Sequence, residues 1–271
     1  MQPPAISERE FAQFQRFIYE AAGISLSPSK KALVCGRLAR RLSHLRLDSY
    51  GDYFALLASG QASDEHALAV DLLTTNETYF FREPRHFELL RKLALAARGN
   101  SQPFRVWSAA CSSGEEAYSI AMVLADCLEQ RPWEVLGTDI SGRVLRKAGY
   151  GHYPMERTDH LPPDYQQRFC LKGQGRYAGT LLVERGLRQR VRFVHANLNT
   201  ALPQLGSFDV IFLRNVLIYF NAETKRQVVE RVLALLKPGG HLLVSHSETL
   251  NDISSAVTAL APSVYLKPVA R

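Results

Sequence analysis

Apolar residues recur with two different periods along the chain, and the change falls near Phe104. Before that point, residues 8–75 repeat apolar side chains every three to four positions, as amphipathic helices do. The first predicted helix has Ser7 as its N-cap and Gly23 as its stop, residue types that favour these two ends. Residues 1–75 are therefore predicted to form an all-helical domain.

The second predicted helix begins at Ser27-Pro28, because a capping residue followed by proline is typical of a helix start. One of its faces is apolar. The other carries basic side chains at helical spacing: Arg37, Arg40, Arg41 and His44. The stretch from Lys30 to Arg46 contains six Lys or Arg and no acid, so this face suits an acidic partner. A merely solvated surface remains an equal alternative for such a run.

Beyond Phe104, short β-rich apolar runs alternate with helical patterns. The apolar runs are FRVWSAA, WEVLGTDI, VRFVHANL, FDVIFLRNVL and GHLLVSHS. Strands alternating with helices predict a parallel, doubly wound α/β sheet with its ligand site at the carboxyl ends of the strands. Residues 91–271 are assigned to this domain. The stretch 173–191 resembles a hairpin instead, which predicts a small antiparallel β subdomain at about 170–191.

The chain has 271 residues, of which 46% are hydrophobic, a composition typical of a globular protein. No apolar run approaches the roughly 20 residues needed to span a bilayer, and the N-terminal sequence lacks the pattern of a signal peptide. The four cysteines are scattered without a C-x-x-C pair, which argues against a zinc site or a disulfide framework. A cytoplasmic protein without a metal and without direct membrane insertion is expected.

The turn after the first strand of the sheet, CSSGEEAYS, lies where nucleotide-binding folds hold phosphate. It has a single glycine, Gly114, followed by Glu115 and Glu116, which oppose a pyrophosphate by like charge. Carboxylates suit a ligand with hydroxyl and ammonium groups, and S-adenosylmethionine has both. The alternative is that the two acids only favour a helix start. Asp139 ends the second strand, where an acid usually binds the ribose diol, so the cofactor interpretation is favoured.

Four motifs in order resemble those of the bacterial chemotaxis receptor methyltransferases, the CheR family. They are TTNETYFFREPRHF, WSAACSSGEEAYSIAM, GTDIS and FLRNVLIYF, and the resemblance covers about residues 8–268. It implies a helical N-terminal domain, a Rossmann-like class I methyltransferase domain with a small β subdomain, and S-adenosylmethionine as cofactor. Ala117 replaces the family's usual proline after the paired glutamates, which is expected to leave binding intact.

The resemblance also implies roles for single residues. Residues 76–90 are expected to be a linker that covers the cofactor, with Arg82 near the methyl group. Tyr219 is expected near the same group, so that it and Arg82 form the catalytic pair. The expected cofactor-binding residues are Asn76, Thr78, Arg82, Glu116, Asp139, Asn197, Leu198, Arg214 and Asn215. His246 and Glu248 are expected to be structural hydrogen-bonding residues.

The implied reaction is methyl transfer to a glutamate of a chemoreceptor, with S-adenosylhomocysteine as product. A glutamate, with a pKa near 4.3, is ionised at neutral pH and needs no general base. Arg37, Arg40 and Arg41 are then predicted to dock on the glutamate-rich helical bundle of the receptor. In some family members the β subdomain binds a C-terminal receptor peptide, and the sequence leaves open whether residues 173–191 do so.

Three rival functions are less consistent with the sequence. A nucleic-acid methyltransferase should have aromatic residues among its basic residues, and the stretch from Lys30 to Arg46 has none. A non-catalytic module that binds S-adenosylmethionine would not need Arg82 and Tyr219. A dinucleotide-dependent oxidoreductase is disfavoured by the paired glutamates and by the missing glycine fingerprint.

Overall fold

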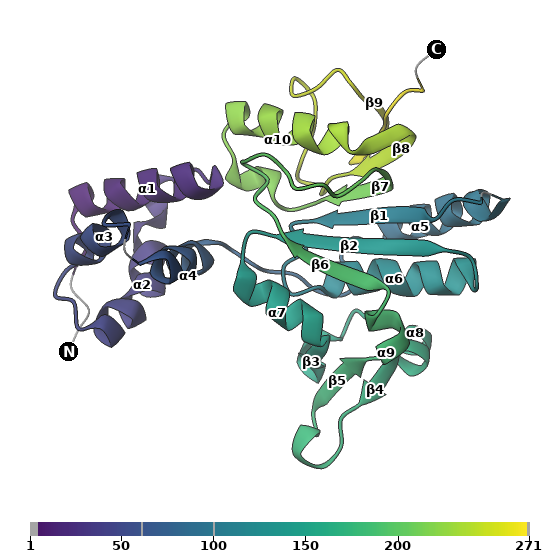
Figure 1. The fold of residues 1–271 in the computed structure, drawn as a ribbon, viewed down its shortest axis with the longest axis horizontal. Coiled ribbons are helices and arrows are strands. Elements are labelled where there is room, and N and C mark those ends of the chain that lie inside the picture. Colours follow the sequence, from purple (N-terminus) through teal and green to yellow (C-terminus); the bar gives the residue numbers. More distant parts are fainter. Residues whose placement is uncertain (1–4, 61, 100, 270–271) are drawn as a thin grey trace. The chain divides into compact units, whose positions relative to one another are not determined.

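A computed structural model describes residues 5–60, 62–99 and 101–269. The chain divides into two compact units, which Figure 1 draws as ribbons. The first unit comprises the residues up to Thr75 together with Tyr219–Lys225, and the second comprises Asn76–Ile218 and the residues from Arg226 onward. Each unit is described below by itself.

The first unit is helical, as predicted. Its elements are α1 (Glu8–Ala22), the 3-10 turn η1 (Pro28–Lys30), α2 (Lys31–Leu45), α3 (Tyr50–Ala58) and α4 (Ser63–Leu73). Ser7 and Glu10 form a reciprocal capping box at the start of α1, and Gly23 ends that helix in the left-handed conformation at φ 72°. Both predicted ends of the first helix are confirmed.

The core of the first unit is aromatic. Phe14 is fully buried, stacks on Tyr53 with ring centroids 6.2 Å apart, and meets Tyr50 edge-on. The predicted start of the second helix was wrong by three residues, because Ser27-Pro28 begins the turn η1 and α2 begins only at Lys31. The Ser27 hydroxyl forms a hydrogen bond with the Ser29 hydroxyl and caps no backbone N–H.

The second unit is built on a seven-stranded sheet of order β6-β2-β1-β7-β8-β10-β9 (Figure 1). The strands are β1 (Phe104–Ala109), β2 (Trp133–Asp139), β6 (Val191–His195), β7 (Phe208–Leu213), β8 (Leu236–Leu243), β9 (Thr258–Ala261) and β10 (Val264–Leu266). The central strand β1 pairs in parallel with both β2 and β7. Their carboxyl ends therefore meet at one edge of the sheet, as the alternating pattern predicted.

Two strands of this sheet were not predicted. β10 pairs antiparallel with β8 and with β9, so the sheet is mixed rather than wholly parallel. Both strands are short, four residues in β9 and three in β10, and the β9 residues are exposed, so neither run is long enough to show a strand period.

A separate three-stranded antiparallel sheet forms the small β subdomain, in the order β3-β5-β4. Its strands are β3 (His152–Pro154), β4 (Cys170–Lys172) and β5 (Thr180–Val183). It begins earlier than residue 170, because β3 pairs with β5. At the other end, Val191 belongs to β6 of the large sheet rather than to the subdomain.

The remaining helical elements connect these strands. They are α5 (Pro84–Ala96), η2 (Ala97–Gly99), α6 (Glu115–Leu128), α7 (Gly142–Tyr150), η3 (Met155–Arg157), α8 (Pro163–Phe169), η4 (Gly175–Tyr177), α9 (Arg185–Arg188), η5 (Leu217–Tyr219) and α10 (Ala222–Ala234). The expected linker 76–90 is irregular only as far as Glu83, because Pro84 starts α5. Helix α5 buries Phe87 and Leu90 in the same apolar cluster as Tyr118 and Ile120 of α6. None of the described helices has both the length and the apolar character of a membrane crossing.

Candidate functional site

The loop between β1 and α6 has a strained backbone at the carboxyl edge of the sheet. Ala110, Ser112 and Gly114 all have positive φ, at 64°, 51° and 94°. A Cβ atom at Gly114 would lie 2.8 Å from the Cβ of Ala148, so only glycine fits there. Two non-glycine residues in a left-handed conformation point to a loop shaped for a ligand, because each costs conformational energy.

Glu116, in the first turn of α6, presents its carboxylate at this loop. Its Oε1 accepts a hydrogen bond of 2.6 Å from the Ser108 hydroxyl at the end of β1. Its Oε2 lies 3.3 Å from Nε of Arg214, which directly follows β7. Burial raises the pKa of Glu116, and Arg214 and Ser108 oppose that shift. The carboxylate is therefore desolvated and only partly compensated by its neighbours.

Glu115 has a different environment, although it is adjacent in the sequence. Its side chain is fully buried, accepts a 2.7 Å hydrogen bond from the Ser113 hydroxyl, and lies 2.8 Å from the guanidinium of Arg157. Burial raises its pKa. Glu115 thus belongs to the packing between α6 and the β subdomain, which leaves Glu116 as the acid at the loop.

Asp139 ends β2, and two backbone N–H groups fix both of its carboxylate oxygens. Ser112 donates to Oδ2 and Ser141 donates to Oδ1, each at 2.9 Å. The residue is 6% exposed. Charge-assisted bonds of this kind orient the carboxylate, a group that accepts hydrogen bonds from donors such as ribose hydroxyls.

The segment 76–83 is joined to the same edge of the sheet by backbone contacts. The carbonyl of Asn76 accepts from the Ser112 hydroxyl at 2.9 Å, and the N–H of Phe81 donates to the Ser119 hydroxyl at 3.0 Å. The carbonyl of Thr78 accepts from Arg157 at 3.0 Å. Three of the predicted ligands, Asn76, Thr78 and Arg82, therefore lie on one segment anchored beside the loop of Gly114.

Arg82 and Arg214 are connected through the backbone of this segment. A guanidinium nitrogen of Arg214 donates to the carbonyl oxygen of Arg82 at 2.5 Å. The side chain of Arg82 is half-buried, donates to the carbonyl of Glu77 at 3.3 Å, and lies over the ring of Tyr79. By contrast, the Arg214 side chain is 1% exposed.

The other predicted ligands follow strands of the same sheet. Asn197 and Leu198 come just after β6, and the side chain of Asn197 accepts from the N–H of Asn199 at 2.9 Å. Asn215 has φ 56°, and its N–H donates to Glu248 at 2.9 Å. Glu248 also accepts from the backbone of Ser245 at 2.9 Å, so its expected structural role is confirmed.

The predicted catalytic Tyr219 belongs to the first unit. Its carbonyl accepts from the N–H of Ser25 at 2.8 Å, next to a β-bridge between Ile24 and Phe220. Its hydroxyl lies within electrostatic range of Arg37. The role of Tyr219 near a transferred methyl group stays a prediction.

The three predicted docking arginines of α2 differ in their surroundings. Arg37 donates to the carbonyl of Leu73 at 2.8 Å and to the Thr75 hydroxyl at 3.0 Å. Arg41 forms a two-point ion pair with the buried Glu65, with Nε to Oε1 at 2.6 Å. Arg40 is exposed and has no partner among the described residues. Only Arg40 is therefore wholly available to an outside partner.

Sequence reasoning missed several polar residues of this edge. Ser108, Ser112, Glu83 and His86 all contact the predicted ligands. A lone serine in a strand has no recognisable pattern. Glu83 has a left-handed backbone, at φ 59°, directly before α5. The only local signal at this position is Pro84, which predicts a helix start but not the role of Glu83.

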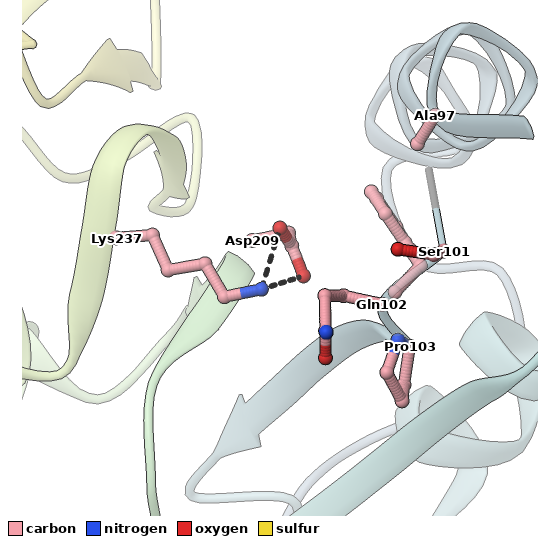
Figure 2. A pocket seen from close by; sticks show the side chains of 7 residues that line it. Ala97, Ser101, Gln102, Pro103, Asp209 and Lys237 are labelled. Atoms are coloured by element: carbon pink, nitrogen blue, oxygen red, sulfur yellow. Dashed lines mark hydrogen bonds and ion pairs between the residues drawn. The ribbon is translucent and has the colours of Figure 1, made fainter. Parts of the chain in front are cut away.

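The opposite edge of the sheet has a cavity of about 240 Å³ between the starts of β1, β7 and β8. Figure 2 shows Lys237 reaching Asp209 across it, and the two form an ion pair at 2.8 Å. Asp209 also accepts from the N–H of Arg105 at 2.8 Å. These charges are matched, so the cavity offers no open charged group comparable to Glu116.

The residues at the carboxyl edge fit S-adenosylmethionine. Asp139 suits ribose hydroxyls, and Glu116 suits an α-ammonium group. Two buried atoms there, Nε of Arg214 and Oε2 of Glu83, have no hydrogen-bond partner among the residues that the structure describes. Nε of Arg214 and Oε2 of Glu83 are opposite in charge and each lacks a hydrogen bond to a described residue, so they suit the carboxylate and ammonium groups of an amino-acid end.

Family models and curated relatives point to the same protein family. The model of the CheR methyltransferase all-alpha domain matches residues 9–74, and that of the CheR methyltransferase SAM binding domain matches residues 76–265. The chemotaxis protein methyltransferase of Escherichia coli (strain K12) is 42% identical over 266 residues, covering 96% of this chain and 91% of that protein. The chemotaxis protein methyltransferase 2 of Pseudomonas aeruginosa is 42% identical over 262 residues, covering 96% of this chain and 93% of that protein.

Proposed function

Because this chain belongs to the CheR methyltransferase family, we propose that it transfers a methyl group from S-adenosylmethionine to glutamate side chains of chemoreceptors. The product on the receptor is a γ-glutamyl methyl ester, and the second product is S-adenosylhomocysteine. The observation that carries the proposal is the desolvated and only partly compensated Glu116 carboxylate beside an Asp139 that is held by two backbone N–H groups.

The cofactor is held by residues from five segments of the sheet edge. Asp139 binds the ribose, Glu116 binds the α-ammonium, and Asn197 and Leu198 flank the adenine. Arg214, Asn215 and the segment from Asn76 to Arg82 complete the site. When bound, S-adenosylmethionine supplies an electrophilic methyl group on a sulfonium. Hydrogen-bond donors and acceptors already fixed in place reduce the ordering cost of binding.

The protein has little proton chemistry to perform in this reaction. The acceptor carboxylate is already ionised at neutral pH. Catalysis therefore rests on alignment and on the exclusion of water, because joining a carboxylate to a sulfonium removes charge. Arg82 and Tyr219 orient the reactants, and a tight ion pair at the attacking oxygen would instead stabilise the ground state. Arg82→Ala should lower turnover, and normal turnover in that variant would exclude Arg82 from the site.

Receptor docking is assigned to the basic face of α2, with Arg40 as its principal contact. The exposed Arg40 can approach a glutamate-rich helical bundle without breaking an internal contact. Arg37 adds positive charge to that face, because both described oxygens to which it donates are neutral, whereas the charge of Arg41 is matched by Glu65. The cytoplasmic location and the absence of a metal requirement stay predictions, and peptide binding at the β subdomain stays an open alternative.

The first experiment is calorimetric titration with S-adenosylmethionine and S-adenosylhomocysteine, comparing the wild type with Asp139→Ala. Loss of the Asp139 carboxylate should weaken binding at least about a hundredfold, because charge-assisted hydrogen bonds contribute about 1.5–3 kcal/mol each. Asp209→Ala is the matched control, since that carboxylate lies at the opposite edge of the sheet. A folded wild type that binds neither ligand would overturn the cofactor assignment.

The acceptor is identified separately, with a radiolabelled methyl group and a receptor cytoplasmic fragment. Label that is released as methanol by mild base, and is absent when the receptor glutamates are changed to alanine, indicates the ester. Label that is stable to base would point to a different acceptor.

A further inference from the structure

Four polar side chains from three separate segments form a connected cluster next to Arg214. Glu83 and His86 lie at the start of α5, His246 follows β8, and Ser263 lies in the turn between β9 and β10. Nδ1 of His86 is 3.2 Å from a guanidinium nitrogen of Arg214, and its Nε2 is 2.8 Å from the Ser263 hydroxyl. His86, His246 and Ser263 have no assigned contact with the cofactor, and Glu83 borders its site through Arg214.

The hydrogen bonds of this cluster determine where the imidazole proton lies. A guanidinium only donates, so Nδ1 of His86 must accept from Arg214. The proton of the neutral ring is then on Nε2, which donates to the Ser263 hydroxyl. That hydroxyl in turn donates to the carbonyl of Pro262 at 2.6 Å. The donor and acceptor directions agree along these bonds, and the Glu83 carboxylate, with Oε2 3.4 Å from the same Nδ1, is the one neighbour among the described residues that would favour a proton there.

His86 is in an environment that keeps it neutral. It is 2% exposed, and burial, reinforced by the charges of Arg214 and His246, lowers its pKa to about 3. A charged ring would repel Arg214 and would have no lone pair to offer it. Neutral His86 is thus the form that the geometry requires.

A metal site is the competing interpretation of this cluster. Glu83, His86 and His246 can each offer one ligand atom, and these atoms lie within 4.8 Å of one another. The Arg214 guanidinium already takes Nδ1 of His86, and Ser263 takes its other nitrogen. A divalent cation would have to displace a buried cation, so the cluster is better suited to holding an arginine.

We propose that His86 is a positioning residue that holds the Arg214 guanidinium between Glu116 and the Arg82 carbonyl. This inference rests on the proposed function, which makes Glu116 and the Arg82 segment part of the cofactor site. Arg214 is 3.3 Å from Glu116 and 3.9 Å from Glu83 through the same Nε atom. Without the acceptor at His86, the guanidinium is free to close onto a carboxylate and to compete with the ligand's α-ammonium.

The test compares His86→Asn with His86→Leu in the full-length protein. Asparagine keeps an acceptor near the position of Nδ1, whereas leucine keeps only the apolar volume. Calorimetry with S-adenosylhomocysteine, without receptor, should give a dissociation constant at least about tenfold higher in His86→Leu and within about threefold of the wild type in His86→Asn. His241→Leu is the matched control, because His241 is a half-buried histidine of β8 near the opposite edge of the sheet.

The kinetic signature separates positioning from a general loss of structure. His86→Leu should raise the KM for S-adenosylmethionine and leave kcat at saturating cofactor within a few-fold of the wild type. Equal affinity in His86→Leu and the wild type, or equal losses in His86→Leu and His86→Asn, would overturn the proposal. A wild type that binds no S-adenosylhomocysteine would instead overturn the proposed function.

A second measurement locates the imidazole proton of His86 in the wild type itself. In ¹⁵N-labelled wild type at neutral pH, the side-chain nitrogen shifts of His86 should show a protonated Nε2 and an unprotonated Nδ1. His86→Asn identifies the signal by its disappearance. A proton on Nδ1 would exclude the bond from Arg214 and with it the positioning role.

Discussion

Two arginine–carboxylate pairs of this protein, each with one buried member, differ in a way that separates structure from function. In the first unit, Arg41 meets Glu65 through two nitrogens, and the Tyr53 hydroxyl donates to the same carboxylate at 2.7 Å. In the second unit, Nε of Arg214 lies 3.3 Å from Glu116 and has no hydrogen-bond partner among the described residues. The first pair is closed, because both oxygens of Glu65 accept hydrogen bonds. The second pair is open, because Nε of Arg214 makes no hydrogen bond to a described residue.

The pKa shifts of the two carboxyl groups follow this difference. The bonds from Arg41 and Tyr53 lower the pKa of Glu65 despite its burial. At Glu116 burial has the larger effect and raises the pKa, although Arg214 and Ser108 oppose it. A buried charge left partly uncompensated costs stability, and such groups cluster at functional sites. The open pair is where a cationic ligand group gains most.

The largest expected effect on stability is at the closed pair. Arg41→Ala leaves the Glu65 carboxylate buried without its main partner, which should lower the free energy of unfolding by about 3 kcal/mol. Urea unfolding followed by circular dichroism measures this loss. Arg40→Ala, one position earlier on the same helix and exposed, is the control and should change it by less than about 0.5 kcal/mol. Comparable losses in both variants would contradict a structural role specific to Arg41.

The matching change at the open pair is Glu116→Gln, which should affect binding rather than stability. Removing the charge should raise the dissociation constant of S-adenosylhomocysteine roughly ten- to a hundredfold, because a hydrogen bond to a charged group contributes about 1.5–3 kcal/mol. The free energy of unfolding should change by less than in Arg41→Ala, because Glu83 still lies near the Arg214 guanidinium when the Glu116 charge is removed. Calorimetry measures the dissociation constant, and urea unfolding of the same sample measures the free energy of unfolding. A destabilised variant with normal binding would assign Glu116 to stability instead of cofactor binding.

Acidification should separate the two pairs, because their pKa values move in opposite directions. Glu116, whose folded pKa is raised above 4.5, takes up a proton first as the pH falls, so ligand affinity should decline while the pH is still above 4.5. Glu65, whose folded pKa is lowered, contributes stability that is present above 4.5 and is lost only as the pH falls through that lower value.

Calorimetry over a pH series measures the decline in affinity, and circular dichroism follows the fold. Glu116→Gln is the control and should lack the decline that comes from this group. The same pH dependence in both proteins would assign the decline to another group.

The smallest expected effect is at the exposed arginine beside the closed pair. Arg40→Glu should raise the KM for a receptor fragment severalfold at low salt, and the effect should shrink at high salt because exposed charges are screened. The dissociation constant of S-adenosylhomocysteine should not change. Arg16→Glu makes the same charge change on the exposed side of α1 and is the control. An unchanged KM in Arg40→Glu would remove α2 as the docking surface.

The helices and most strands were predictable because their signals are local. The capping box at Ser7, the stop at Gly23 and the strand ending in Asp139 each depend on residues within a few positions. Asp139 and Glu116 were recognised as candidate ligands because carboxyl ends of parallel strands gather at one edge of a sheet. Strand β10 was missed because it is short and depends on pairing with β8 and β9 for its existence.

The sequence by itself determined the helical and the α/β parts of the chain, most of their elements in order, and the edge of the sheet that presents the acids. Only the tertiary structure decided which charges are matched. Glu65 meets Arg41 from another helix, and His86 meets Arg214 from a strand end 128 positions away. Whether a buried charge is compensated depends on neighbours brought together by folding, and their distances and directions cannot be derived from local spacing. For this reason Arg41, predicted as a docking residue, proved to be held in a structural pair, while His86 was found only in the folded protein.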